Sequence, residues 1–173
     1  MPTVYLGHGA AGTVASMKPY VDGLKRRGVD ATAVNLKPGR SVPKAERALP
    51  LFREQVPDLL HAVIGGHSFG GRVASLLAAE EPCAGLVLFS YPLHAPGKQE
   101  AWRERSAHWA RIACPVLLLS GEADPFADID LLRKEVRQLK KAELVIYARA
   151  GHGLAGVLDQ ALDRAAAFVK SLR

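Results

Sequence analysis

The stretch Gly65-Gly66-His67-Ser68-Phe69-Gly70-Gly71 follows a short apolar run and precedes a segment rich in alanine and leucine. It contains Gly-x-Ser-x-Gly, a pattern that presents a serine hydroxyl at the edge of a sheet when it lies between a strand and a helix. Such a turn forces Ser68 into a strained backbone conformation and leaves no room for side chains at Gly66 and Gly70. Taken alone, the pattern also fits a glycine-rich turn in which the serine only caps the helix.

On both sides of this turn, short apolar runs alternate with helical patterns. Most of the runs are continuously apolar, as expected for strands that are covered on both faces. Alternating strands and helices imply a parallel sheet with helices on both faces. The predicted strands are residues 3–6, 32–36, 62–65, 85–90, 116–120 and 143–147.

The helical segments between these strands have recognisable ends. Gly28 supplies a C-terminal stop for the first amphipathic helix, and Asp128 is a suitable N-cap for a later one. Residues 45–61 have a helical pattern in which Pro50 and Pro57 are expected to interrupt the helix.

Length and composition predict one compact domain over residues 1–173, of which 49% are apolar. The net charge is +6, but the basic residues are scattered, so nucleic acid is not an expected partner. No apolar run approaches the roughly 18 residues that cross a membrane, and the N-terminus lacks the pattern of a secretion signal. We therefore expect a cytoplasmic protein without membrane association. Cys83 and Cys114 each precede one of two neighbouring strands, and we expect free buried thiols there, with a bond between the two as the alternative.

A serine nucleophile needs a base, and the base needs a carboxylate that orients it. Asp124 follows the fifth predicted strand and His152 follows the sixth, so both should lie at the same edge of the sheet as Ser68. Asp128 and Asp130 are rival carboxylates, but they belong to the start of the next helix. Alternatively, Asp124 is only a turn aspartate before a proline, and His152 is only a surface histidine in a glycine-rich loop.

The loop after the first strand, Gly7-His8-Gly9-Ala10-Ala11-Gly12, is a candidate for binding an oxyanion. Acyl transfer needs two backbone N–H groups that point at the developing negative charge. We expect these to be the N–H groups of Phe69 and Ala10. A phosphate-binding loop is the alternative, but the spacing is neither Gly-x-Gly-x-x-Gly nor that of a Walker loop.

With these residues the chain resembles the α/β-hydrolases over essentially its whole length. More narrowly, it is similar to the small lidless hydrolases related to dienelactone hydrolase, a group that includes the testis-expressed and NSL-complex-subunit hydrolase-like proteins. The group often has arginine, methionine and proline where this chain has His67, Phe69 and Ala95. The narrower similarity rests on HGA (residues 8–10), GGHSFGGRVAS (65–75), SYPLHAPGK (90–98) and GEADPF (121–126).

The resemblance implies a three-layer αβα sandwich with a six-stranded parallel sheet, strand order 2-1-3-4-5-6, and no cap domain. It also implies a serine hydrolase that cleaves small esters or thioesters through an acyl-enzyme, with Ser68 as nucleophile, His152 as base and Asp124 as its orienting acid. No metal or organic cofactor is implied, and the protein is expected to be a monomer or a homodimer.

Other roles stay open within this resemblance. A non-catalytic binding module, an acyltransferase or a peptidase could use the same residues. Three side chains in the predicted loops, His8, Tyr91 and His94, are candidate substrate contacts. Arg72 and Lys98 are further candidates that could bind a substrate carboxylate, although an ion pair for Arg72 and solvation for Lys98 are the simpler interpretations.

Overall fold

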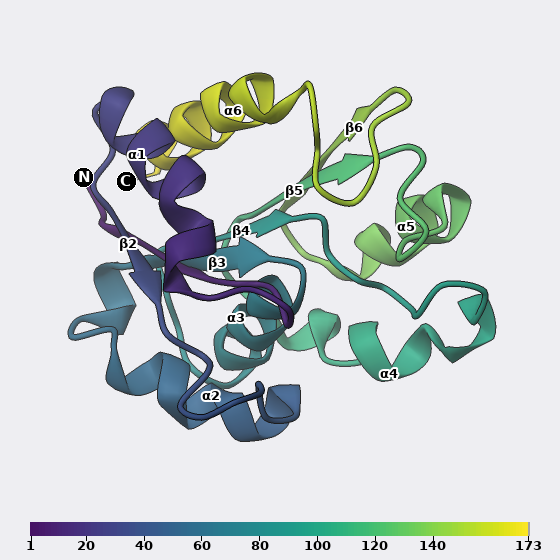
Figure 1. The fold of residues 1–173 in the computed structure, drawn as a ribbon, viewed down its shortest axis with the longest axis horizontal. Helices are drawn as coiled ribbons and strands as arrows, with labels where there is room; N and C mark the ends of the chain where they lie inside the picture. The colour runs from purple at the N-terminus through teal and green to yellow at the C-terminus, as the bar shows by residue number, and fades with distance from the viewer. Residues whose placement is uncertain (173) are drawn as a thin grey trace.

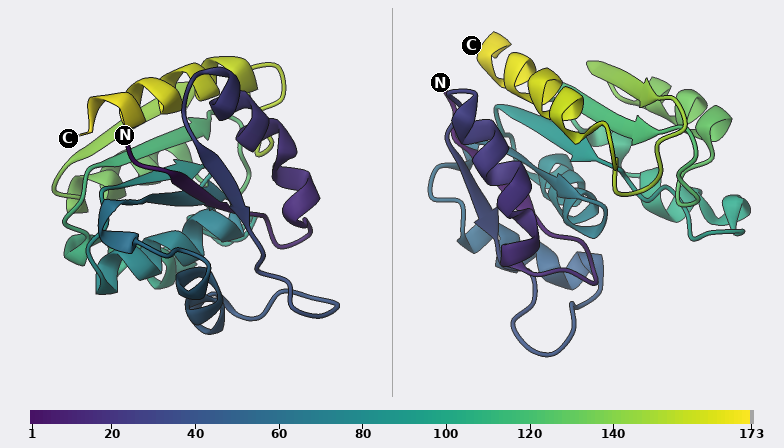
Figure 2. Two further views of the ribbon diagram at one scale, coloured as in Figure 1. Left: turned by 90° about the vertical axis from the view of Figure 1, so that its left-hand side faces the viewer. Right: turned by 45° about the horizontal axis from the view of Figure 1, so that its top comes forward.

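The computed structural model describes residues 1–172 and has a parallel sheet at its centre with helices on both faces (Figures 1 and 2). Its strands pair in parallel in the order β2-β1-β3-β4-β5-β6, which confirms the predicted topology. No cap domain lies over the sheet in the described residues. The strands are β1 (Val4–Gly7), β2 (Ala31–Val34), β3 (Val63–His67), β4 (Gly85–Phe89), β5 (Val116–Gly121) and β6 (Ala142–Tyr147).

Two hydrophobic cores lie on opposite faces of the sheet. On one face pack α1 (Lys18–Arg26) and α6 (Leu158–Ser171), whose buried residues form a cluster with Leu6 and Phe89 (Figure 2). On the other face pack α2 (Ala45–Glu54), α3 (Phe69–Glu80) and α5 (Ile129–Glu135). None of the helices in the described part of the chain has the length and apolar content needed to cross a bilayer.

The parallel register fixes where the loops meet. Gly7 of β1 pairs with Gly66 of β3, and Gly121 of β5 pairs with Tyr147 of β6. Because all strands point the same way, the segments that follow β1, β3, β5 and β6 emerge at one edge of the sheet. Those segments contain every residue that the sequence predicts for catalysis.

The predicted helix ends are confirmed, but one predicted interruption is wrong. Gly28 has a φ of +76°, and the Asp128 carboxylate accepts a hydrogen bond from the Leu131 N–H at 3.0 Å. Helix α2, however, continues through Pro50 and ends only before Gln55. Pro50 is exposed, so water can satisfy the carbonyl that its missing N–H leaves free, while the opposite side of α2 packs on the sheet.

The connection between β4 and β5 consists of short helical turns, of which α4 (Arg103–Ser106) is the only α-helical one in the described chain. The one-turn helices elsewhere are Val14–Met17, Leu59–His61, Gln99–Ala101, Trp109–Arg111 and Val136–Gln138. Cys83 and Cys114 stand just before β4 and β5 as free thiols, with their Sγ atoms 3.5 Å apart. This confirms that the two thiols are free and neighbouring.

His108, in the same connection, is a buried histidine held neutral by its surroundings. Its Nε2 lies 2.7 Å from Ser75 Oγ, and the Ser75 hydroxyl donates to the Arg72 carbonyl, so the histidine donates to Ser75. The pKa of His108 is lowered to about 4, chiefly by burial and in smaller part by the nearby positive charges of Arg111 and Arg72. The folded protein therefore takes up this proton less readily than the unfolded chain.

This shift predicts a pH-dependent loss of stability. Below about pH 6.5 the unfolded chain binds the proton and the folded protein does not, so stability falls as the pH drops towards 4. Relative to a His108→Gln variant, the wild type should lose roughly 2–3 kcal/mol of unfolding free energy between pH 7 and pH 4. Urea unfolding at several pH values measures this difference, and parallel pH profiles for the two proteins would contradict the assignment.

Candidate active site

Ser68 lies in the tight turn between β3 and α3. Its backbone has φ +50° and ψ −117°, a left-handed conformation that residues with side chains rarely adopt. The end of β1 presses against this turn, because a Cβ on Gly66 would lie 2.4 Å from the Gly7 carbonyl oxygen and one on Gly70 would lie 2.1 Å from it. The predicted strained turn with two obligatory glycines is therefore present, and it holds the Ser68 hydroxyl at the edge of the sheet.

A chain of hydrogen bonds joins Ser68 to His152 and Asp124. Nε2 of His152 lies 2.8 Å from Ser68 Oγ, and Nδ1 lies 2.7 Å from Asp124 Oδ2. Because the carboxylate can only accept, Nδ1 carries the proton and Nε2 is free to accept one from the serine hydroxyl. The three residues come from the turns after β3, β5 and β6, as their positions in the sequence predicted.

Within this hydrogen-bonded chain, the Asp124 carboxylate is buried and the His152 imidazole is partly exposed. The Asp124 side chain is 0% exposed, whereas that of His152 is 23% exposed. The second carboxylate oxygen accepts the Phe126 N–H at 2.8 Å, so both oxygens are paired and the buried charge is compensated. The Asp124 carboxylate thus holds the imidazole at Nδ1, while Nε2 faces the serine.

Phe126 fixes the plane of the imidazole, a role that our sequence analysis did not assign. Its ring stacks on that of His152, with centroids 4.3 Å apart and planes inclined by 29°. Because Phe126 lies only two residues after Asp124, the carboxylate and the stacking ring come from the same turn. The sequence signal was the GEADPF motif, which contains both residues.

The rival residues have other tasks in the structure. Asp128 caps α5, and the exposed Asp130 lies 3.5 Å from Arg133. His61 is exposed and bonds to Asp58. Arg72 pairs with Glu46 at 3.4 Å, in agreement with the simpler of its two predicted roles.

The structure corrects the prediction that His8 and His94 contact substrate. The exposed fractions of these side chains are 0% and 1%. The ring of His8 accepts the Leu36 N–H through Nε2 at 2.9 Å, and that of His94 accepts the Asp128 N–H through Nε2 at 2.8 Å. In each ring Nδ1 donates to the carbonyl of the following residue. Both histidines therefore tie together two loops that are distant in sequence.

The same correction applies to Tyr91. The side chain is fully buried, its hydroxyl donates to the Arg105 carbonyl, and its ring meets that of Trp109 edge-on at 5.0 Å. Burial also raises the pKa of the phenol, which stays neutral. None of the three predicted contact residues lines the cleft at Ser68, because each satisfies polar backbone groups beneath the surface.

We expect His94→Ala to lower the free energy of unfolding by about 2–3 kcal/mol, since it leaves the Asp128 N–H unpaired and opens a cavity. Chemical denaturation measures the change. The matched control is His61→Ala, which removes an exposed imidazole and should stay within about 0.5 kcal/mol of the wild type. Equal stability of the two variants would contradict the structural role of His94.

A cleft of about 450 Å³ opens above Ser68. The backbone N–H groups of Ala10, which lines the cleft, and of Phe69, which directly follows Ser68, donate to no other atom in the described residues. Phe69 is the first residue of α3, where helix N–H groups lack partners within the helix. The cleft is lined by Gly9, Ala10, Ala11, Gly12, Ser16, Met17, Tyr20, His67, Ser68, Phe126, His152 and Gly153.

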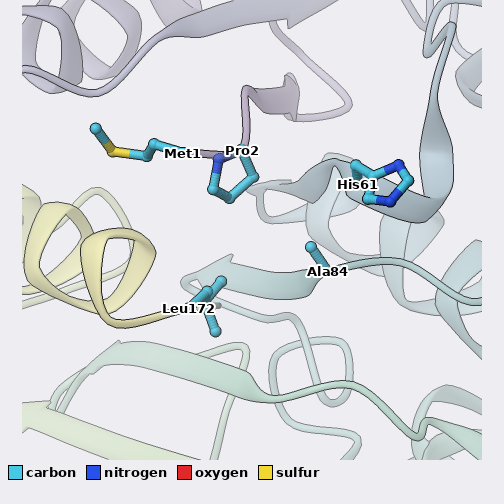
Figure 3. Close-up of a pocket in the computed structure, with 5 residues that line it drawn as sticks. All are labelled: Met1, Pro2, His61, Ala84 and Leu172. Atoms are coloured by element: carbon cyan, nitrogen blue, oxygen red, sulfur yellow. The ribbon is translucent and has the colours of Figure 1, made fainter.

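A second pocket, of about 350 Å³, lies at the other end of the sheet (Figure 3). It is lined by Met1, Pro2, His61, Ala84 and Leu172, and no nucleophile stands beside its histidine. Pro2, His61, Ala84 and Leu172 lie around one space, whereas the Met1 side chain extends away from His61 (Figure 3). Of these two cavities in the described part of the chain, the cleft at Ser68 is the one that combines a nucleophile, a base and free N–H groups.

Comparison with known proteins agrees with this fold. A family model described as "Alpha/beta hydrolase domain" matches residues 3–168. A monoacylglycerol lipase from Paleococcus ferrophilus has a similar structure, with a TM-score of 0.82 at 16% identity, covering 99% of this chain and 96% of the lipase. A dienelactone hydrolase from Anabaena variabilis gives 0.73 at 20% identity, covering 99% and 88%. A thioesterase domain from the curacin biosynthetic pathway gives 0.73 at 16% identity, covering 98% and 91%.

Proposed function

The chain belongs to the α/β-hydrolase domain family, and from that premise we propose that it is a serine hydrolase that cleaves small esters or thioesters through an acyl-enzyme. The observation that carries the proposal is the hydrogen-bonded chain from Ser68 through His152 to Asp124, which opens into a cleft. The narrower similarity to lidless dienelactone-hydrolase relatives is part of the same proposal.

In the proposed reaction, Ser68 Oγ attacks the substrate carbonyl while His152 Nε2 takes the serine proton. The buried Asp124 carboxylate stabilises the imidazolium that forms. The tetrahedral intermediate collapses when His152 returns the proton to the departing alcohol or thiol, which leaves an acyl group on Ser68. Water, activated by the same imidazole, then releases the acid and regenerates the serine.

The N–H groups of Ala10 and Phe69 are the proposed oxyanion hole. Ala10 lines the cleft, Phe69 directly follows Ser68, and neither N–H group has another partner among the described residues. An oxyanion between them would also lie at the N-terminal end of α3, where the helix dipole favours negative charge. Each such donor contributes roughly 3 kcal/mol of transition-state stabilisation.

The lining of the cleft supports a small, uncharged substrate. Among the residues that the structure describes, no lysine, arginine, aspartate or glutamate lines it, and glycine and alanine form much of its rim. The similar structures include a monoacylglycerol lipase and a thioesterase domain by name, which is consistent with an ester or thioester. The substrate is the one partner that the proposal requires.

Covalent labelling and ester hydrolysis test the proposal together. The wild type should react with a fluorophosphonate probe and hydrolyse p-nitrophenyl esters, with the highest kcat/KM for short acyl chains. Ser68→Ala should do neither, whereas Ser16→Ala, which removes the other serine hydroxyl lining the cleft, should still react with the probe. If the wild type neither reacts with the probe nor hydrolyses any ester, the hydrolase proposal is rejected in favour of a non-catalytic binding module.

A further inference from the structure

Tyr20, in the first turn of α1, brings an unused hydroxyl to the cleft. The residue is 7% exposed, and its ring packs edge-on against Phe89 with centroids 5.0 Å apart. Burial raises the pKa of the phenol to about 12, so it stays protonated. The hydroxyl has no hydrogen-bond partner in the described structure, and it is not one of the unpaired polar atoms that are buried away from solvent. Solvent therefore reaches it, and the cleft is the opening that Tyr20 lines.

His67 brings a second unused polar atom to the same wall. Its Nε2 lies 3.1 Å from the His152 carbonyl oxygen, which can only accept, so Nε2 carries the proton. Burial lowers the pKa of His67, which favours the neutral ring. The remaining nitrogen, Nδ1, therefore holds a lone pair, and no group in the described residues donates to it.

The space in front of Nδ1 is open because residue 9 is a glycine. A Cβ on Gly9 would lie 3.2 Å from His67 Nδ1, in tight contact with it. The rings of Tyr20 and His67 have centroids 5.9 Å apart, so their free atoms share one wall of the cleft. Neither atom belongs to the proposed triad or oxyanion hole.

These two atoms select a particular ligand chemistry. Nδ1 of His67 can only accept a hydrogen bond, whereas the Tyr20 hydroxyl can donate or accept one. A substrate hydroxyl can give its proton to Nδ1 and accept from Tyr20. A carboxylate has no proton to give, and no described lysine or arginine lines the cleft to balance the charge of a carboxylate or a phosphate. An alkyl group would leave both atoms unpaired.

We propose that Tyr20 and His67 form a subsite that recognises one or two hydroxyl groups of the substrate, so that the preferred substrates are hydroxylated esters. This proposal rests on the proposed hydrolase function and adds a substrate class to it. The hydroxyl belongs either to the alcohol part or to the acyl part of the ester, and separate substrates distinguish the two.

The test compares esters that differ by a hydroxyl in place of a methyl group. For the alcohol part the pair is 2-hydroxyethyl butyrate and propyl butyrate; for the acyl part it is ethyl 3-hydroxybutyrate and ethyl 3-methylbutyrate. In one of the pairs the wild type should prefer the hydroxylated ester about tenfold in kcat/KM, as expected for one or two partly exposed hydrogen bonds. Tyr20→Phe should reduce that ratio roughly fivefold.

Two further variants make the ratio decisive. Gly9→Ala should also reduce the ratio, since its methyl group occupies the space before Nδ1 while both polar atoms remain. Tyr5→Phe is the matched control, because it removes a tyrosine hydroxyl that lines no part of the cleft and should leave the ratio unchanged. Equal kcat/KM for both members of each pair, with no effect of Tyr20→Phe, overturns the subsite while the hydrolase function stands.

A binding measurement separates the subsite from turnover. In Ser68→Ala, NMR titration should show tighter binding of the hydroxylated member of the preferred pair, and adding Tyr20→Phe should remove that difference. If the wild type hydrolyses no ester while the Ser68→Ala protein shows this binding preference, the hydrolase function is rejected and the subsite stands. Equal binding of both members would reject the subsite.

Discussion

Replacing Asp124 by asparagine is expected to lower kcat/KM for ester hydrolysis about 10⁴-fold with little change in the fold. Asparagine keeps the size of the side chain, and its oxygen can still accept the Phe126 N–H. Its amide would then face Nδ1 of His152 with a donor, so the imidazole would carry its proton on Nε2, where the serine needs an acceptor. Steady-state kinetics with a p-nitrophenyl ester measure the loss.

The matched control for this prediction is Asp130→Asn. Asp130 lies six residues further along the chain, is exposed and pairs only with Arg133. We expect its replacement to leave kcat/KM within about twofold of the wild type, as for a surface substitution away from the site. If Asp130→Asn and Asp124→Asn were equally active, the hydrogen bond from His152 to Asp124 would have no part in turnover.

Replacing Gly70 by alanine is expected to lower the free energy of unfolding by about 3 kcal/mol or more, or to prevent folding. The new Cβ would lie 2.1 Å from both the carbonyl carbon and the carbonyl oxygen of Gly7. Those atoms belong to β1, which is paired on both sides within the sheet and cannot move alone. The start of α3 would therefore have to separate from the sheet, and Ser68 would move with it.

Gly39→Ala provides the control for the Gly70 variant. A Cβ at Gly39 would meet no atom within 4 Å, and its φ is not in the left-handed region. Its unfolding free energy should stay within about 1 kcal/mol of the wild type, with a small gain the favoured direction. Urea denaturation of both variants measures the contrast. A Gly70→Ala protein as stable as Gly39→Ala would mean that β1 and α3 do not approach each other as closely as described.

The strands and the three residues of the hydrogen-bonded chain could be predicted because they depend on local sequence signals, whereas the strand order was implied by the resemblance to the α/β-hydrolases. Continuous apolar runs identify strands covered on both faces, and parallel strands bring the loops after β3, β5 and β6 to one edge. The tight turn at Ser68 is set by glycines within two residues of it. This glycine pattern is carried by neighbours in the chain, so the close approach of Gly7 to the turn did not have to be known in advance.

The roles of His8 and His94 depend on distant contacts and therefore escaped the sequence analysis. Each imidazole accepts a backbone N–H from a loop far along the chain, at Leu36 and at Asp128. Nothing in the residues next to these histidines indicates which backbone group will arrive. A polar residue in a loop near a predicted site is thus ambiguous until the packing is known, since binding and loop anchoring use the same side chains.

Pro50 shows the same limit for a helix. A proline at this position predicts an interruption of the helix, yet α2 continues because Ala48 and Phe52 are buried on the side that faces the core. Packing of these residues outweighs the loss of one hydrogen bond on the exposed side. Local preference predicts the break, and tertiary packing removes it.

The most direct test of the account is the site of fluorophosphonate attachment. Cleavage after Arg53 and Arg72 releases residues 54–72, a peptide in which Ser68 is the only serine and which contains no threonine or tyrosine. Mass spectrometry of the treated protein should find one adduct, on this peptide, and Ser68→Ala should abolish it. An adduct on any other peptide, or an unmodified protein under conditions that label a known serine hydrolase, would contradict the claim that Ser68 is an activated nucleophile.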